Sequence, residues 1–166
     1  MKVLIAAASK HGATAEIADA IGAGLAARGH TVTVLAAEKV EAVHPFEGAV
    51  LGSAVYAGHW MKPAIDLAER FTDRWADRAV WLFSSGPIGD PPKPEEDPVD
   101  VERVMSLTGA RAHRIFTGRL DKSKLSFPER AIVTAFRAPY GDFRNWEEIG
   151  AWANEIAEEL VGVGSG

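Results

Sequence analysis

The sequence contains no cysteine. This excludes a disulfide framework, an iron–sulfur cluster, a thiolate zinc site and a cysteine nucleophile. Positive charge is also scarce: 18 Lys and Arg against 23 Asp and Glu give a formal charge of −5. A chain with this balance has no general attraction for nucleic acid or anionic lipid. We predict neither a metal site nor a nucleic-acid partner.

Long hydrophobic runs are missing as well. No stretch approaches the roughly 20 apolar residues that a transmembrane helix needs. The apolar run at residues 1–8 is too short for a signal peptide and is followed by Ser9-Lys10-His11-Gly12. We therefore expect a soluble, cytoplasmic protein. Its 166 residues, 47% of them hydrophobic, suffice for one domain with a real core.

Short apolar or β-branched runs alternate with segments of helical periodicity. The runs predict strands at residues 3–7, 31–35, 49–52, 79–84 and 110–117. Stripes of apolar residues and capping signals predict helices at residues 14–28, 63–71, 99–107, 127–137 and 145–161. The last of these has the best start signal, because Asn145 is followed by Glu148 in a capping box.

This alternation predicts an α/β fold, a doubly wound five-stranded parallel sheet of order 2-1-3-4-5 with helices on both faces. We expect one domain over residues 1–161, an insertion at about residues 120–144 after the fifth strand, and a frayed tail at residues 162–166. In this strand order, ligands bind beyond the carboxyl ends of strands 1 and 3. Three loops, at residues 9–14, 53–60 and 85–90, are thereby candidates for a binding site.

The first loop is Ser9-Lys10-His11-Gly12-Ala13-Thr14. It leads from a strand into a helix N-terminus, where free backbone N–H groups and the helix dipole favour a phosphate. Ser9 and Thr14 add hydroxyl donors, and Lys10 adds a positive charge. The alternative is a plain strand–helix turn with a solvated lysine.

Other phosphate-binding classes lack their motifs here. There is no Gly-x-x-x-x-Gly-Lys-Ser/Thr, which excludes a P-loop NTPase, and no Gly-x-Gly-x-x-Gly after the first strand, which argues against a dinucleotide site. Residues 6–8 are all alanine, and Gly52-Ser53 ends the third strand. The acidic residues of a phosphorelay receiver are therefore absent from both places.

The second loop joins small residues to two large aromatic ones, and its candidate ligand-binding residues are Ser53, Ala54, Val55, Tyr56 and Trp60. Tyr56 and Trp60 can stack on a planar ring, although Trp60 can instead pack against the following helix. His59 is a weak candidate for a catalytic group, and the alternative is a solvated side chain. The third loop supplies flexible backbone for the edge of a heterocycle, through Ser85, Gly86, Pro87, Ile88, Gly89 and Asp90.

With these loops in order, the chain resembles the flavodoxin-like FMN-binding family. More closely, it is similar to the branch that includes menaquinone-dependent protoporphyrinogen oxidase. The resembling segments are Ser9-Lys10-x-Gly12-x-Thr14, Gly52 to Trp60 and Asn145-Trp146-Glu147-Glu148. Two departures stand out. Ala13 replaces an asparagine found in many flavodoxins, and Tyr56-Ala57 replaces an Arg-Tyr pair of the oxidases.

The resemblance implies noncovalent FMN, with its phosphate on residues 9–14 and its isoalloxazine between the second and third loops. It also implies an electron carrier, or an oxidoreductase of the protoporphyrinogen-oxidase type that acts on a quinone or a porphyrinogen. The rival hypothesis is a non-redox binding or interaction module that keeps the fold and has lost FMN. A homodimer is one assembly that we consider for this chain. A phosphate-ester hydrolase is disfavoured, since no pair of nucleophile and base stands out.

Overall fold

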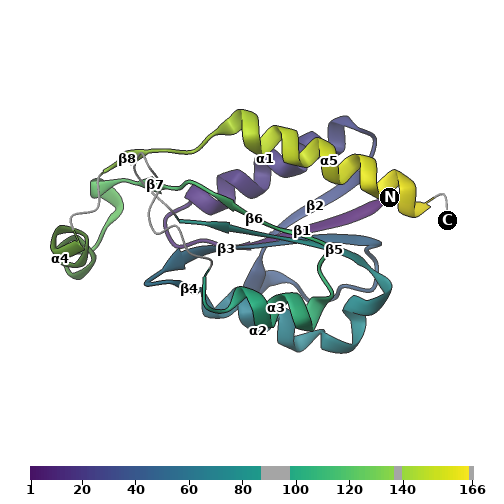
Figure 1. Ribbon diagram of the computed structural model, residues 1–166, viewed down its shortest axis with the longest axis horizontal. Helices are drawn as coiled ribbons and strands as arrows, with labels where there is room; N and C mark the ends of the chain where they lie inside the picture. Colours follow the sequence, from purple (N-terminus) through teal and green to yellow (C-terminus); the bar gives the residue numbers. More distant parts are fainter. Residues whose placement is uncertain (87–97, 137–139, 165–166) are drawn as a thin grey trace.

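A parallel sheet of five strands forms the centre of the computed structural model, which describes residues 1–86, 98–136 and 140–164 (Figure 1). Its order is β2-β1-β3-β5-β6, and each of these neighbouring strands pairs in parallel. The strands are β1 (Lys2–Ala8), β2 (Thr31–Ala36), β3 (Gly48–Tyr56), β5 (Ala79–Ser85) and β6 (His113–Phe116). Counted along the chain, this is the predicted order 2-1-3-4-5, and the predicted fold class is confirmed.

Helices cover both faces of the sheet (Figure 1). On one face lie α1 (Ala13–Ala27) and α5 (Trp146–Gly164), and on the other lie α2 (Lys62–Arg70) and α3 (Val101–Thr108). Short 3₁₀ turns occur at Ala37–Lys39, Thr72–Asp77 and Lys122–Lys124. None of the helices in the described ranges is long and apolar enough to cross a membrane.

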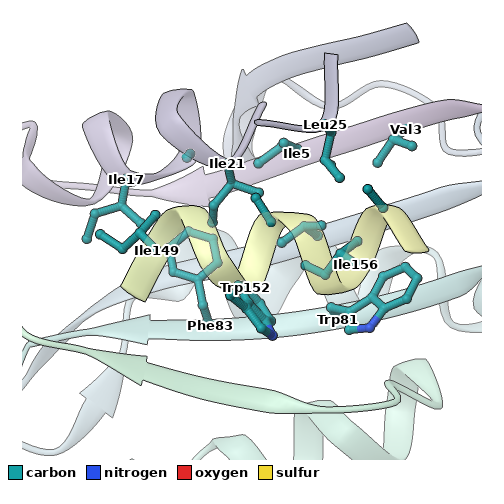
Figure 2. Close-up of a cluster of buried hydrophobic side chains, with 14 of the residues drawn as sticks. Val3, Ile5, Ile17, Ile21, Leu25, Trp81, Phe83, Ile149, Trp152 and Ile156 are labelled. Carbon is teal, nitrogen blue, oxygen red and sulfur yellow. The ribbon is translucent and has the colours of Figure 1, made fainter. Parts of the chain in front are cut away.

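Aromatic packing holds α5 on the sheet (Figure 2). Trp152 meets Phe116 edge-on, with ring centroids 5.5 Å apart, and meets Phe83 at 6.3 Å. Phe83 in turn lies against Gly52 of β3, where an added Cβ would come within 2.2 Å of the ring. The glycine at this position therefore provides the space that the Phe83 ring occupies.

The opposite face has its own core, built around Leu67, Trp75 and Leu82. Trp75 is fully buried, and its Nε1 donates a hydrogen bond to the carbonyl of Ala68 (2.9 Å). The sequence leaves open whether Trp75, Trp81 and Trp152 belong to the core or to an interface. The structure places all three in the core.

The structure has two small antiparallel pairings that the sequence does not predict: one extends the sheet at β3, and the other forms a separate two-stranded sheet. β3 continues to Tyr56 and turns through Ala57 and Gly58, both with left-handed φ angles (50° and 79°), into β4 (His59–Trp60). Beyond β6, β7 (Arg119–Leu120) pairs with β8 (Gly141–Asp142) to form a ribbon. In the sequence, α4 (Phe127–Phe136) comes between the two strands of the ribbon. In space, it lies outside both helical layers (Figure 1).

The observed element ends differ from prediction by a few residues. Asn145 caps α5 as predicted, since its Oδ1 accepts a hydrogen bond from the Glu148 backbone N–H (3.1 Å). The helix continues to Gly164, three residues beyond its predicted end and into the expected tail. β6 is shorter than predicted, because Gly109 ends α3 and residues 110–112 connect the two elements.

Candidate functional site

A cavity of about 300 Å³ opens at the carboxyl ends of β1, β3 and β5. All three candidate loops contribute to its wall. The first loop supplies Ser9, His11, Ala13 and Thr14, the second supplies Ala54, Val55, Tyr56 and Ala57, and the third supplies Ser85 and Gly86. The volume is at the lower end of the range of small-molecule sites. The cavity lies where the reversal of strand order predicts a ligand.

The first loop leaves the N-terminus of α1 open to an anion. Gly12 adopts a left-handed conformation (φ 89°), and no side chain caps the helix within the described residues. The Gly12 N–H instead donates to Ser9 Oγ (3.1 Å), which holds the serine against the turn. The first turn of α1, whose Ala13 and Thr14 line the cavity, therefore begins without a side-chain cap, and an uncapped helix N-terminus suits an oxyanion.

A carboxylate from α4 lies on the same loop. Glu129 Oε2 is 2.7 Å from His11 Nε2 and 3.3 Å from Lys10 Nζ. The hydrogen bond to His11 is the main cause that lowers the pKa of Glu129 to about 2. Burial, together with the Glu129 carboxylate, raises the pKa of Tyr56 to about 12. At neutral pH the cavity thus has an ionised Glu129 and a neutral Tyr56.

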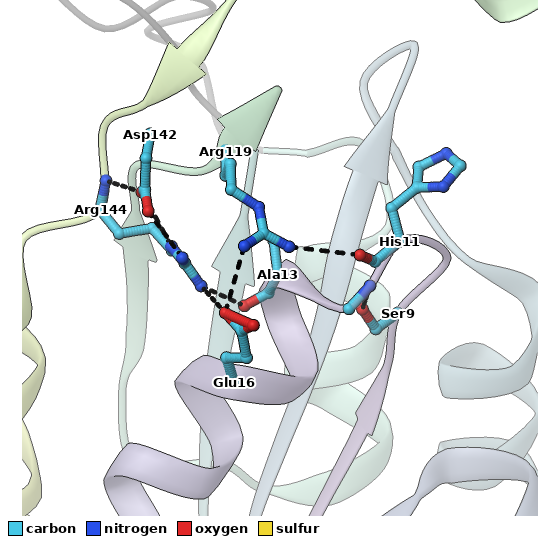
Figure 3. A network of polar contacts seen from close by, with 8 residues as sticks. Ser9, His11, Ala13, Glu16, Arg119, Asp142 and Arg144 are labelled. Carbon is cyan, nitrogen blue, oxygen red and sulfur yellow. Dashed lines mark hydrogen bonds and ion pairs between the residues drawn. The ribbon is translucent and has the colours of Figure 1, made fainter. Parts of the chain in front are cut away.

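A second polar network fixes the ribbon to α1 (Figure 3). The Arg144 side chain is only 4% exposed, and its guanidinium bonds to Glu16 Oε2 (2.5 Å), Asp142 Oδ2 (2.7 Å) and the Ala13 carbonyl (3.3 Å). Arg119 makes longer contacts, to Glu16 Oε2 (3.5 Å) and to the His11 carbonyl (3.4 Å). The Arg144 guanidinium holds the pKa values of Glu16 and Asp142 below their usual range.

In the second loop, only part of the predicted set reaches the cavity. Tyr56 is 41% exposed and lines it, whereas Trp60 is 4% exposed and packs in the core with α2. Trp60 Nε1 donates to Ser84 Oγ (2.7 Å), which itself bonds to His113 Nε2 (2.7 Å). In the structure, Trp60 therefore packs against the following helix, which is the alternative to its predicted role in stacking on a ligand. Tyr56 is the aromatic residue of this loop that faces the cavity.

Two further predicted residues have structural contacts instead of cavity positions. Ser53 is fully buried; its Oγ donates to the Ala54 carbonyl (2.8 Å) and accepts from the Met61 N–H (2.9 Å). His59 is exposed, and its Nδ1 lies 3.1 Å from Asp100 Oδ2. Asp100 also accepts from the Trp60 N–H (3.0 Å), so His59 belongs to the anchorage of the hairpin.

Comparison with known proteins decides the family. The family model described as a flavodoxin domain matches residues 4–144. The chain belongs to the flavodoxin-domain family. No curated protein matches the chain. Neither the family model nor the solved structures cited below point to the branch of protoporphyrinogen oxidase.

Solved structures share the fold at low sequence identity. Flavodoxin 2 from Bacillus cereus is 24% identical, with a TM-score of 0.65 over 96% of this chain and 99% of that one. A flavodoxin from the domain Archaea is 19% identical, with a TM-score of 0.62 over 96% and 99%. The rubredoxin oxygen:oxidoreductase of Desulfovibrio gigas, 13% identical with a TM-score of 0.65, matches 97% of this chain with 36% of its own.

Membership of the flavodoxin family implies FMN as the cofactor. The residues of this flavodoxin domain fit such a group: an uncapped helix N-terminus for the phosphate, and small residues on the walls for close approach. At Gly86, an added Cβ would lie 2.9 Å from Val55 Cβ, so a side chain there would press on the cavity wall. The remaining predicted residues of the third loop, Pro87, Ile88, Gly89 and Asp90, lie outside the described residues.

The segment predicted as an insertion, at about residues 120–144, supplies cavity residues that sequence reasoning missed. Seven residues of that segment line the wall, and Gly118 and Arg119 just before it also do; the seven are Leu120, Asp121, Lys124, Leu125, Glu129, Ile132 and Val133. One local signal was available, since Ser126 and Glu129 have the spacing of a capping box. That spacing locates the start of a helix but does not reveal that Glu129 also contacts residues 10 and 11.

Proposed function

We propose that this flavodoxin domain binds FMN in the cavity and transfers electrons through it. The observation that supports this most directly is the meeting of the first loop, Tyr56 and Ser85-Gly86 around one cavity at the switch point of the sheet. The proposal assigns the phosphate to the first loop and the isoalloxazine to the space between the second and third loops. The phosphate-binding residues are then Ser9, Lys10, His11, Gly12, Ala13 and Thr14.

Each part of the chain has a defined task in this proposal. FMN, when bound, supplies one- and two-electron transfer, which a chain without cysteine does not provide through thiols. The first loop binds through backbone N–H groups and the Ser9 and Thr14 hydroxyls. Tyr56 presents an aromatic face for ring stacking, and its raised pKa keeps its hydroxyl protonated.

Flavin titration of the purified chain tests the proposal. We expect a perturbed visible spectrum, quenched flavin fluorescence and a midpoint potential different from that of free FMN. Riboflavin, which lacks the phosphate, should bind at least about tenfold more weakly, because it forgoes charge-assisted hydrogen bonds. A chain that leaves the spectrum and fluorescence of FMN unchanged would instead be a binding module that keeps the fold without the cofactor.

A second candidate is an oxidoreductase with its own small-molecule substrate. The insertion favours it, because Leu120, Leu125, Ile132 and Val133 add an apolar wall to the cavity. A carrier that only exposes a flavin edge needs no such wall. Oxidation of a porphyrinogen by the FMN-loaded chain with a quinone acceptor would support the protoporphyrinogen-oxidase type. Electron transfer without such turnover would favour the carrier.

A further inference from the structure

Glu129 contacts the Lys10 and His11 side chains of the loop to which the FMN phosphate is assigned. Its Oε2 contacts both His11 Nε2 (2.7 Å) and Lys10 Nζ (3.3 Å). A carboxylate and a phosphate are both oxyanions, and both accept hydrogen bonds from lysine and histidine side chains. The side chain of Glu129 lines the same cavity as Ser9, Ala13 and Thr14. The chain therefore places an anion of its own beside the predicted phosphate position.

The other carboxylate oxygen of Glu129 takes part in the cap at the start of α4. Glu129 Oε1 accepts from the Ser126 N–H (3.1 Å), and the Glu129 N–H donates to Ser126 Oγ (3.3 Å), which completes a capping box. One side chain thus connects the start of α4 to the first loop. Most of α4 is otherwise exposed, with Phe127 at 85% and Ile132 at 58%. Few apolar contacts therefore compete with Glu129 for control of where α4 lies.

We propose that Glu129 is a latch that holds α4 on the first loop and that competes with the phosphate of FMN for Lys10 and His11. This inference rests on the proposed binding of FMN. A phosphate dianion next to an ionised carboxylate is repelled by it. Protonation does not relieve this repulsion at neutral pH, since the pKa of Glu129 is about 2. The carboxylate withdraws instead, and α4 leaves the loop with it.

The movement is confined to the outer part of the insertion. Arg144 ties the ribbon to α1 through Glu16 and the Ala13 carbonyl, and these contacts do not involve Glu129. Leu125, Ile132 and Val133 line the cavity next to the latch. Their displacement opens the apolar wall, so the cofactor's phosphate controls access to the cavity as well as its own affinity.

Dissociation constants for FMN and riboflavin, measured by fluorescence quenching, test the latch. Glu129→Gln keeps an acceptor for the Ser126 N–H and removes the charge. We expect it to bind FMN about tenfold more tightly than the unaltered chain, with riboflavin unchanged. Glu158→Gln, an equal charge change on α5, is the control and should alter neither constant. Weaker or unchanged FMN binding by Glu129→Gln overturns the latch, as does an equal gain for riboflavin.

Limited trypsin digestion at Lys122 and Lys124, both exposed next to α4, gives an independent readout. FMN should accelerate cleavage there in the unaltered chain, and riboflavin should not. Glu129→Gln should be cleaved at the faster rate without flavin. If FMN binds equally to both proteins and cleavage does not change, the latch fails while the proposed function stands. If neither protein binds FMN, both proposals fail.

Discussion

Arg144 and Glu16, 128 positions apart in the sequence, form an ion pair of 2.5 Å that joins the segment between β8 and α5 to the first turn of α1. The same guanidinium bonds to Asp142, and its side chain is almost fully buried. Arg144 also stacks over Trp146, 4.5 Å from the ring centroid. This one side chain therefore fixes the far end of the insertion beside the cavity.

Replacing Arg144 by alanine should destabilise the fold by about 2 kcal/mol, because several charge-assisted hydrogen bonds are lost at a buried guanidinium. Urea unfolding measures this change. The control is Arg28→Ala, which breaks the exposed pair between Arg28 and Glu158 (3.6 Å) and should cost less than about 1 kcal/mol. Equal losses in the two variants would contradict the structural role of Arg144.

Glu16 should make stability depend on pH. Arg144 lowers the pKa of Glu16 in the folded chain below its ordinary value of 4.5. The unfolded chain therefore binds a proton first as the pH falls, and this stabilising contribution is present above pH 4.5 and lost below it. Unfolding free energies of the unaltered chain and of Glu16→Gln should differ most at neutral pH and converge in acid. A gap that widens in acid would refute this assignment.

Substitutions of Tyr56 and of Trp60 should affect different properties of the chain, FMN binding in the first case and stability in the second. Tyr56→Ala should weaken FMN binding by about tenfold through loss of an aromatic face, with little change in stability. Trp60→Phe should leave the FMN dissociation constant nearly unchanged and lower stability by about 1 kcal/mol, since the hydrogen bond from Nε1 to Ser84 is lost. Flavin titration and urea unfolding of both variants check the pair. The opposite result, in which Trp60→Phe weakens FMN binding and Tyr56→Ala does not, would place Trp60 in the cofactor site.

Gly52→Ala should be severely destabilising, by about 3 kcal/mol or more, since the new methyl group meets the Phe83 ring between two packed layers. Gly150→Ala on α5 is the matched control, because its Cβ would meet nothing within 4 Å. That change should be neutral or stabilise by up to about 1 kcal/mol through helix propensity. Thermal unfolding of both variants gives the comparison.

The sheet and its main helices were predictable because their signals are local. Val3 to Ala7 is a continuous apolar run, as expected of a strand covered on both faces, and Ile17, Ile21 and Leu25 repeat with helical spacing. The predicted ranges of these elements agree with the structure to within a few residues. The cofactor follows from the family, and the location of the cavity follows from the strand order.

The contacts around the cavity were not predictable in the same way. β4 has two residues, too few for any periodicity, so its pairing with β3 and the burial of Trp60 leave no pattern in the sequence. The contact between His11 and Glu129 spans 118 positions. It depends on how the insertion returns to the sheet, which composition and spacing do not encode.

The two ends of the insertion meet at its base. Thr117 Oγ1 donates to the Phe143 carbonyl, the Phe143 N–H donates to the Gly118 carbonyl (3.0 Å), and β7 pairs with β8 just beyond. The entropic cost of closing this loop depends only slowly on the number of residues between the paired strands. Residues 121–140 can therefore be lengthened, shortened or exchanged for a different cover while the sheet below keeps its register. The closed base thus separates changes in residues 121–140 from the sheet of this flavodoxin fold.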